Sequence, residues 1–291
     1  MLAKMPIFAD KNSVNLPMRT LYVSDLDGTL LGRDSRVSAA SAALLNRLID
    51  ERGVLFTVAT ARTPATVVPL MQQVHVRLPL LTMTGAAWWD AAADRFTRTQ
   101  ALPTDVVEQV QAIFASHDLH PFVYRRCGDR LEAHHGGRLN DDEQHFVRER
   151  MHLRIKRFRL GAEADADSSD EALLIFAMND YDRLALVHRD IISTVPCTAM
   201  FYRDIFAPTT GLLEVYRHGC TKAAAMRELA AQLGADRVVA FGDNLNDLDM
   251  LRAADVAVAV ANAVPEVRAA AHIVIGDNTT DAVPRFIESF E

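Results

Sequence analysis

The chain is poor in cysteine. Only Cys127, Cys197 and Cys220 occur among its 291 residues, and they form no Cys-x-x-Cys pair. An odd number of widely spaced thiols argues against a disulfide framework and against a zinc site. The cysteine content therefore indicates reduced thiols, as is typical of a cytoplasmic protein.

Long apolar runs and an excess of positive charge are also missing. No stretch approaches the roughly 18 uninterrupted apolar residues of a membrane span, and Pro6, Asp10 and Lys11 interrupt the segment where a signal peptide would be apolar. The formal net charge of −7 argues against a dedicated nucleic-acid or anionic-membrane binder. We therefore expect a soluble protein with no nucleic acid and no membrane as partner, and we interpret residues 1–18 as a short extension.

Lysine is scarce, since only four of the 31 basic residues are lysines. One of them, Lys222, opens a predicted helix, where the helix dipole disfavours a cation. An anion bound at that helix end would reverse the penalty, and an ammonium suits a transferring phosphate. A solvated surface lysine is the simpler alternative, because most lysines are exposed.

Two carboxylates follow the first apolar run of the chain. Asp25 and Asp27 come after Leu21-Tyr22-Val23, and residues two apart on a strand project to the same side. The carboxyl end of a strand is where open α/β sheets build their sites. Paired carboxylates repel unless a cation lies between them or one holds a proton, so the pattern suits an acid, a base, a nucleophile or a metal ligand. Gly28 and Thr29 then favour a tight turn.

An acid-rich turn follows a second apolar strand far downstream. The strand expected over 237–241 leads into Gly242-Asp243-Asn244-Leu245-Asn246-Asp247. Asp243 leaves the strand end, and Asn246 and Asp247 fall in the first turn of the next expected helix, where acids suit the dipole. Helix capping alone would also explain Asn246 or Asp247. Because both segments show the same order of strand, acidic turn and helix, they predict two halves of one site.

Strands and helices alternate at both ends of the chain, which predicts right-handed crossovers and a parallel sheet. The expected strands are 20–24, 54–59, 78–83, 212–215, 237–241, 256–260 and 273–275; the expected helices include 38–51, 221–233, 246–254 and 282–290. The middle of the chain instead mixes short strand patterns with two helices, Thr104–His117 and Tyr181–Val195.

We therefore predict an α/β fold, with a doubly wound, Rossmann-like parallel sheet and an inserted α+β domain. The predicted division is an extension at 1–18, a first core segment at 19–84, an inserted domain at 85–210 and a second core segment at 211–291.

Four motifs, in this order, resemble the haloacid dehalogenase-like (HAD) superfamily of hydrolases, and within it the Cof-like subfamily with a large inserted cap. They are Asp25-Leu26-Asp27-Gly28-Thr29, Thr60 after a strand, Lys222 at a helix start, and the segment Gly242 to Asp247. The resemblance extends from about residue 19 to the end of the chain. It implies a magnesium-dependent phosphatase that acts on a small phosphorylated metabolite through an aspartyl phosphate.

The resemblance also implies a role for each motif residue. Asp25 is the implied nucleophile and Asp27 the acid and base, with Thr60 and Lys222 completing the catalytic set. The implied Mg²⁺ site consists of Asp25, Asp243 and the backbone carbonyl of Asp27, with Asp247 holding a metal-bound water; oxygen ligands of this kind suit magnesium. The implied phosphate and substrate contacts are Gly28, Thr29, Arg62, Thr84, Gly85 and Asn246.

The chain departs from the family pattern at Thr84-Gly85, where members usually carry Asn-Gly, so a hydroxyl would replace the amide in that contact to the substrate. Arg125 and Arg126 lie in a basic part of the insert and are candidates to contact a second anionic group of the substrate. A solvated basic face is the alternative for both.

Two other functions stay open. A phosphomutase shares the aspartyl-phosphate chemistry but returns the phosphoryl group to a sugar, and a regulator would bind a phosphorylated ligand without turnover. The joint presence of Asp25, Asp27, Lys222 and Asp243 weighs against the regulator, because binding alone requires neither a nucleophile nor an acid. The expected partner is a small phosphate ester, and we expect a monomer or a homodimer.

Overall fold

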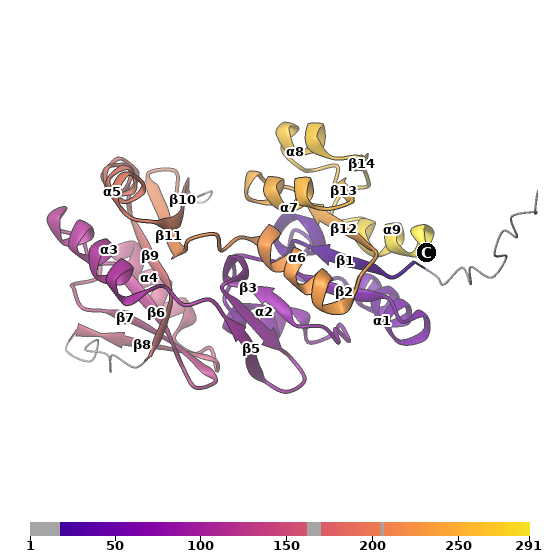
Figure 1. Cartoon of the computed structure of the whole chain (residues 1–291), viewed down its shortest axis with the longest axis horizontal. Coiled ribbons are helices and arrows are strands. Elements are labelled where there is room, and N and C mark those ends of the chain that lie inside the picture. The colour runs from indigo at the N-terminus through magenta and orange to yellow at the C-terminus, as the bar shows by residue number, and fades with distance from the viewer. Residues whose placement is uncertain (1–17, 162–169, 205–206) are drawn as a thin grey trace, which may run out of the picture.

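The core of the molecule, on the right in Figure 1, is built on a five-stranded parallel sheet in the order β14-β13-β12-β1-β2. The structure is a computed structural model that describes residues 18–161, 170–204 and 207–291, so the predicted extension lies outside the described residues up to residue 17. β1 pairs with β2 on one side and with β12 on the other. The direction of winding therefore switches at β1, and the carboxyl end of such a strand is where open α/β sheets bind ligands.

The core elements follow the predicted alternation, which confirms the predicted fold class. Thr20–Ser24 is buried throughout, and Ser38 caps the first helix by accepting a hydrogen bond from the Ser41 amide. The elements are β1 (Thr20–Ser24), α1 (Ala39–Arg52), β2 (Leu55–Val58), α2 (Pro64–Met71), β3 (Leu80–Thr82), α6 (Lys222–Leu233), β12 (Arg237–Gly242), α7 (Leu248–Ala253), β13 (Val256–Ala259), α8 (Pro265–Ala270), β14 (Ile273–Val274) and α9 (Ala282–Phe290).

A small antiparallel sheet extends the core beyond the predicted boundary at residue 84. β4 (Ala87–Asp90) pairs with β3 and with β5 (Arg95–Thr99), and a parallel bridge between Ala59 and Leu81 attaches β3 beside β2. Residues 85–99 therefore stay with the core instead of opening the inserted domain.

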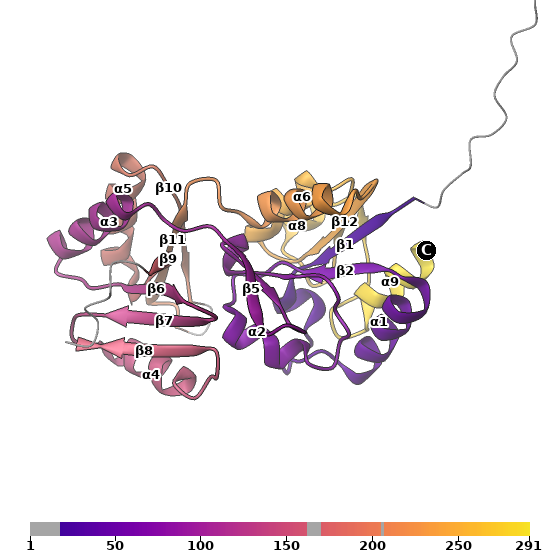
Figure 2. The same cartoon turned by 60° about the horizontal axis from the view of Figure 1, so that its bottom comes forward.

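The inserted domain is a six-stranded sheet in the order β10-β11-β9-β6-β7-β8, antiparallel except for the pair β7 and β8. In Figure 2 it lies beside the core, to which two chain segments connect it. Its elements are α3 (Thr104–Ser116), β6 (Phe122–Cys127), β7 (Arg130–His135), α4 (Asp141–Arg150), β8 (Lys156–Leu160), β9 (Glu171–Asp180), α5 (Tyr181–Thr194), β10 (Cys197–Arg203) and β11 (Thr210–Arg217).

The two faces of the inserted sheet are covered by different helices. Helices α3 and α5 pack on the face that carries Val123, Ile175 and Leu213. Helix α4 packs on the opposite face through Phe146, whose ring lies 5.3 Å from that of Phe176. The alternation of side chains along each strand therefore assigns even-numbered residues of β11, such as Glu214, to the second face.

The strand expected at 212–215 belongs to the inserted domain and not to the core. β11 is antiparallel to both β9 and β10, so the inserted sheet continues to Arg217, beyond the predicted boundary at residue 210. The apolar pattern of this segment predicts a buried strand correctly, but such a pattern does not specify which sheet the strand joins.

One buried lysine lies within the inserted domain. Lys156 is 4% exposed, and its ammonium lies 5.6, 5.1 and 4.9 Å from the ring centres of Tyr124, Phe146 and Phe158. Among the described residues, no carboxylate forms an ion pair with it. Burial and the neighbouring positive charge of Arg150 lower the pKa of Lys156 to about 7.

Two further observations concern the whole described chain. Cys127, Cys197 and Cys220 are all free thiols. In the ranges 18–161, 170–204 and 207–291, no helix combines the length and apolar character needed to cross a membrane.

Candidate active site

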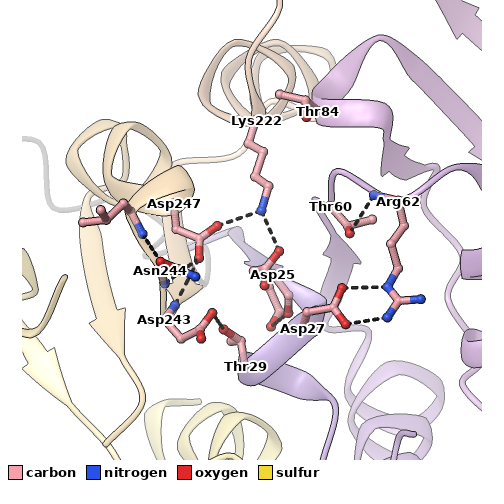
Figure 3. A network of polar contacts seen from close by, with 12 residues as sticks. Asp25, Asp27, Thr29, Thr60, Arg62, Thr84, Lys222, Asp243, Asn244 and Asp247 are labelled. Carbon is pink, nitrogen blue, oxygen red and sulfur yellow. Dashed lines mark hydrogen bonds and ion pairs between the residues drawn. The ribbon is translucent and has the colours of Figure 1, made fainter. Parts of the chain in front are cut away.

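Lys222 joins the two acidic motifs. Its ammonium donates hydrogen bonds to Asp25 Oδ1 at 2.6 Å and to Asp247 Oδ1 at 2.7 Å (Figure 3). Burial by itself would lower the pKa of Lys222, but the carboxylates of Asp247 and Asp25 outweigh burial and raise it. Lys222 is therefore a buried ammonium, and the alternative of a solvated surface lysine is wrong.

Three carboxylates meet at the ends of β1 and β12. One oxygen each from Asp25, Asp243 and Asp247 lies within 4.8 Å of the others. Burial and the charge of Asp247 raise the pKa of Asp25 well above its usual value and that of Asp243 to about 6. A cation among these oxygens would relieve that repulsion, and a donor set made only of carboxylates suits a hard divalent ion such as Mg²⁺.

Asp247 is held more tightly than the other two acids. It is fully buried, and its Oδ2 accepts hydrogen bonds from the amides of Asp243 at 3.1 Å and Asn244 at 3.2 Å. Both of its oxygens are therefore engaged, so Asp247 positions Lys222 and the turn, while Asp25 and Asp243 keep more free acceptor capacity. The predicted helix start at Asn246 is wrong, because Leu245–Asp247 forms a short 3₁₀ turn before α7. The Asn246 side chain is exposed.

Arg62 binds the second acid of the first motif. Its Nε and Nη2 donate to Asp27 Oδ2 and Oδ1, both at 2.6 Å, and Figure 3 shows the Asp27 side chain directed to Arg62. The buried Thr60 lies beside this pair, because its hydroxyl accepts a hydrogen bond from the Arg62 amide at 3.1 Å. Arg62, predicted as a substrate contact, thus has a carboxylate partner in this structure.

The turn after β1 requires glycine. Gly28 has φ +75°, and a Cβ there would overlap the carboxylate of Asp243. The Thr29 hydroxyl donates to Asp243 Oδ1 at 3.2 Å, and Asn262 Nδ2 donates to the Gly28 carbonyl at 2.7 Å. Gly28 and Thr29 therefore shape the part of the site around Asp243. Sequence reasoning missed Asn262, whose only signal is its place just after a predicted strand.

A strained turn follows β3. Met83, Thr84 and Gly85 have φ values of +51°, +56° and +95°, and a β-branched residue rarely adopts such a conformation. A Cβ on Gly85 would lie 2.8 Å from the Thr221 carbonyl oxygen, so the turn packs directly against the start of α6. Thr84 is buried, and its hydroxyl contacts Met200 Sδ of the inserted domain at 4.0 Å. Strain of this kind is common where a site over-determines the backbone.

The two arginines predicted to contact the substrate have partners in the inserted domain and on β5 of the core. Arg125 donates to the Asp170 carbonyl at 2.9 Å. Arg126 donates to the Gly128 carbonyl at 3.0 Å and contacts Thr99 and Glu171 at 3.4 Å. None of these partners belongs to the acidic centre.

Fold and site together define an α/β protein whose acidic centre lies at the carboxyl edge of a parallel sheet, beside an inserted domain. A family model for haloacid dehalogenase-like hydrolases matches residues 22–287, and the chain belongs to this family. The predicted resemblance is thus confirmed.

Known relatives cover almost the whole chain. It is 26% identical to the 5-amino-6-(5-phospho-D-ribitylamino)uracil phosphatase YitU of Bacillus subtilis, over 93% of this chain and 97% of that one. It is 27% identical to the pyridoxal phosphate phosphatase YbhA of Escherichia coli, over 91% and 96%. A solved HAD subclass IIB sugar phosphatase superposes with a TM-score of 0.69 at 20% identity, over 93% of this chain and 98% of that chain. Because this last identity is low, it shows the fold alone.

Proposed function

We propose that this protein is a magnesium-dependent phosphatase that hydrolyses the phosphate ester of a small metabolite through an aspartyl phosphate on Asp25. One observation carries the proposal: the buried ammonium of Lys222 holds the carboxylate of Asp25 within a cluster of acids. A carboxylate can attack a phosphate dianion only where fixed positive charge offsets their repulsion.

The chain's own residues supply the steps of the reaction. Asp25 Oδ attacks phosphorus, and the bond to the leaving oxygen breaks. Lys222 stabilises the negative charge on the transferring group. Asp27 protonates the leaving oxygen and then accepts the proton of the water that hydrolyses the aspartyl phosphate, since one carboxyl group can serve both steps. For this, one oxygen of Asp27 must leave Arg62 for the ester oxygen, while the other keeps its hydrogen bond to Arg62.

Asp25 and Asp243 are the residues that would hold Mg²⁺, with the Asp27 carbonyl as a third protein ligand. The bound ion would neutralise charge on the phosphoryl oxygens and on the nucleophile. Thr29 and Gly28 support this role, because the first orients the Asp243 carboxylate and the second leaves space for it.

A small metabolite is the proposed substrate because the relatives are named for phosphorylated small molecules. The three free thiols support a reducing compartment, the cytoplasm, as the location.

The test is release of inorganic phosphate from 4-nitrophenyl phosphate and a panel of phosphorylated metabolites, with Mg²⁺ or with excess chelator. We expect turnover that requires Mg²⁺ and falls more than about 10³-fold in Asp25→Asn, which keeps the shape of the side chain but removes the nucleophile. Asp105→Asn, an exposed acid in the first turn of α3, is the matched control and should retain activity.

Two outcomes would contradict the proposal. Activity of Asp25→Asn within tenfold of the parent would reject Asp25 as nucleophile. Conversion of a hexose phosphate into its isomer with little free phosphate would favour the phosphomutase.

A further inference from the structure

The face of the inserted sheet that contacts Thr84 of the core through Met200 carries a buried carboxylate held by two tyrosines. Glu214 lies on β11 and is 7% exposed. Its Oε1 accepts a hydrogen bond from the Tyr202 hydroxyl and its Oε2 one from the Tyr216 hydroxyl, both at 2.9 Å. We call these three residues the Tyr-Glu-Tyr cluster. Sequence reasoning missed the Tyr-Glu-Tyr cluster. The signal was the single acid inside the apolar run Leu212 to Val215, because a buried acid needs hydrogen-bond partners.

Strand register places this cluster beside the active site. Met200 on β10 is directly opposite Glu214 on β11, and Met200 is the residue whose sulfur contacts Thr84 of the core. Directly opposite residues of an antiparallel pair have Cβ atoms about 5 Å apart. Glu214 is thus the cross-strand neighbour of Met200, the residue that contacts Thr84 of the core.

The charges of the core act on the cluster. Burial raises the pKa of Glu214, and the hydrogen bonds from Tyr216 and Tyr202, with the positive charge of Lys222, oppose this rise. Lys222 of the acidic centre is therefore close enough for its charge to act on Glu214. A phosphoryl group held between Asp25 and Lys222 would direct its ester substituent away from the core sheet, towards this part of the inserted domain.

We propose that Met200, Tyr202 and Glu214 bind the leaving group of the substrate and select one that carries hydroxyl or amine donors and no negative charge. This inference rests on the proposed phosphatase function. Glu214 retains acceptor capacity for such donors, and the half-exposed Tyr202 offers a ring edge and a hydroxyl. A second phosphate or a carboxylate on the leaving group would meet a buried acid. This is the opposite of the preference expected from Arg125 and Arg126.

Two six-carbon ligands that differ in one group provide the test. Glucitol 6-phosphate ends in a hydroxymethyl group where 6-phosphogluconate ends in a carboxylate. Their inhibition constants are measured in competition with 4-nitrophenyl phosphate, so neither has to be turned over. We expect the parent to bind glucitol 6-phosphate about tenfold more tightly, and Glu214→Gln to reduce this ratio to about one by removing the repulsion. Glu171→Gln, an exposed acid of the same sheet, should leave the ratio unchanged.

Tyr202→Phe is the second variant and keeps the inference testable if Glu214→Gln fails to fold. It should weaken glucitol 6-phosphate by about three- to tenfold, because a hydrogen bond to the ligand is lost, and leave 6-phosphogluconate nearly unaffected. Equal binding of both ligands by the parent, an unchanged ratio in Glu214→Gln, or no effect of Tyr202→Phe would each overturn the inference alone. No hydrolysis of any ester by the parent would overturn the proposed function, and the inference with it.

Discussion

Replacing Lys156 with methionine should stabilise the protein, and by more at pH 7 than at pH 9. The ammonium of Lys156 is surrounded by three aromatic rings, and burial lowers its pKa from 10.5 to about 7. Because the folded-state pKa of this cation is depressed, the unfolded chain binds the proton more tightly between pH 7 and 10.5. Stability therefore rises with pH across that window.

The size of the effect follows from the gap between the two pKa values. One pKa unit corresponds to about 1.36 kcal/mol. The depressed pKa of Lys156 therefore lowers the free energy of unfolding by about 4 kcal/mol at pH 7, where half of the folded molecules carry the proton. At pH 9 the loss is about 2 kcal/mol. Methionine has a similar shape and no charge, so the advantage of Lys156→Met over the parent should shrink by about 2 kcal/mol between these pH values.

Urea unfolding followed by circular dichroism at both pH values measures this difference. Arg157→Met is the matched control, since Arg157 is the exposed neighbour on β8, and its effect should stay within about 0.5 kcal/mol at either pH. An advantage of Lys156→Met that is equal at pH 7 and pH 9 would refute the assignment of a depressed pKa.

Three further substitutions test the site. Gly28→Ala should reduce kcat at least about 100-fold, because its Cβ would displace Asp243; Gly53→Ala, at a similar φ of +69° with open space around it, should lose stability but not activity. Thr84→Asn should raise the melting temperature by about 1–3 °C in a thermal scan, since asparagine tolerates a positive φ better than threonine; a lower melting temperature would speak against strain at this turn. Arg62→Gln should slow hydrolysis of an alkyl phosphate about tenfold more than that of 4-nitrophenyl phosphate, whose leaving group needs no proton, because Arg62 positions the proton donor; equal losses would instead indicate direct phosphate binding.

The parts of the fold that depend on local sequence were predicted well. The apolar runs at 20–24 and 237–241 are β1 and β12, and the helix that Gly53 ends is α1. Periodicity and capping act over a few residues, so one sequence is enough to detect them. The partner of a strand depends on distant segments, and for that reason the apolar pattern places the strand at 212–215 in the wrong sheet.

The candidate site also has a part that the sequence predicts and a part that it does not. Asp25, Asp243 and Lys222 follow strand ends or begin a helix, so their meeting follows from a parallel sheet. The bidentate pair between Asp27 and Arg62 could not be predicted, because it depends on side-chain directions across two loops. Arg125 and Arg126 were selected for charge alone, and charge does not show whether nearby carbonyls and carboxylates already bind them.

The pairing of β1 with β12 constrains the order in which the molecule can fold. Thr20 and Arg237 lie opposite each other on these neighbouring strands, and the Arg237 side chain donates a hydrogen bond to the Thr20 hydroxyl, although 217 positions separate the two residues in the chain. During synthesis β1 leaves the ribosome early but has no β12 to pair with until most of the chain has been made. The elements of the inserted domain, from α3 to β11, are complete sooner and pair with each other. The nascent chain therefore carries a folded inserted domain while β1 and β2 still lack β12. Until β12 is made, the apolar core strands can pair incorrectly with other strands.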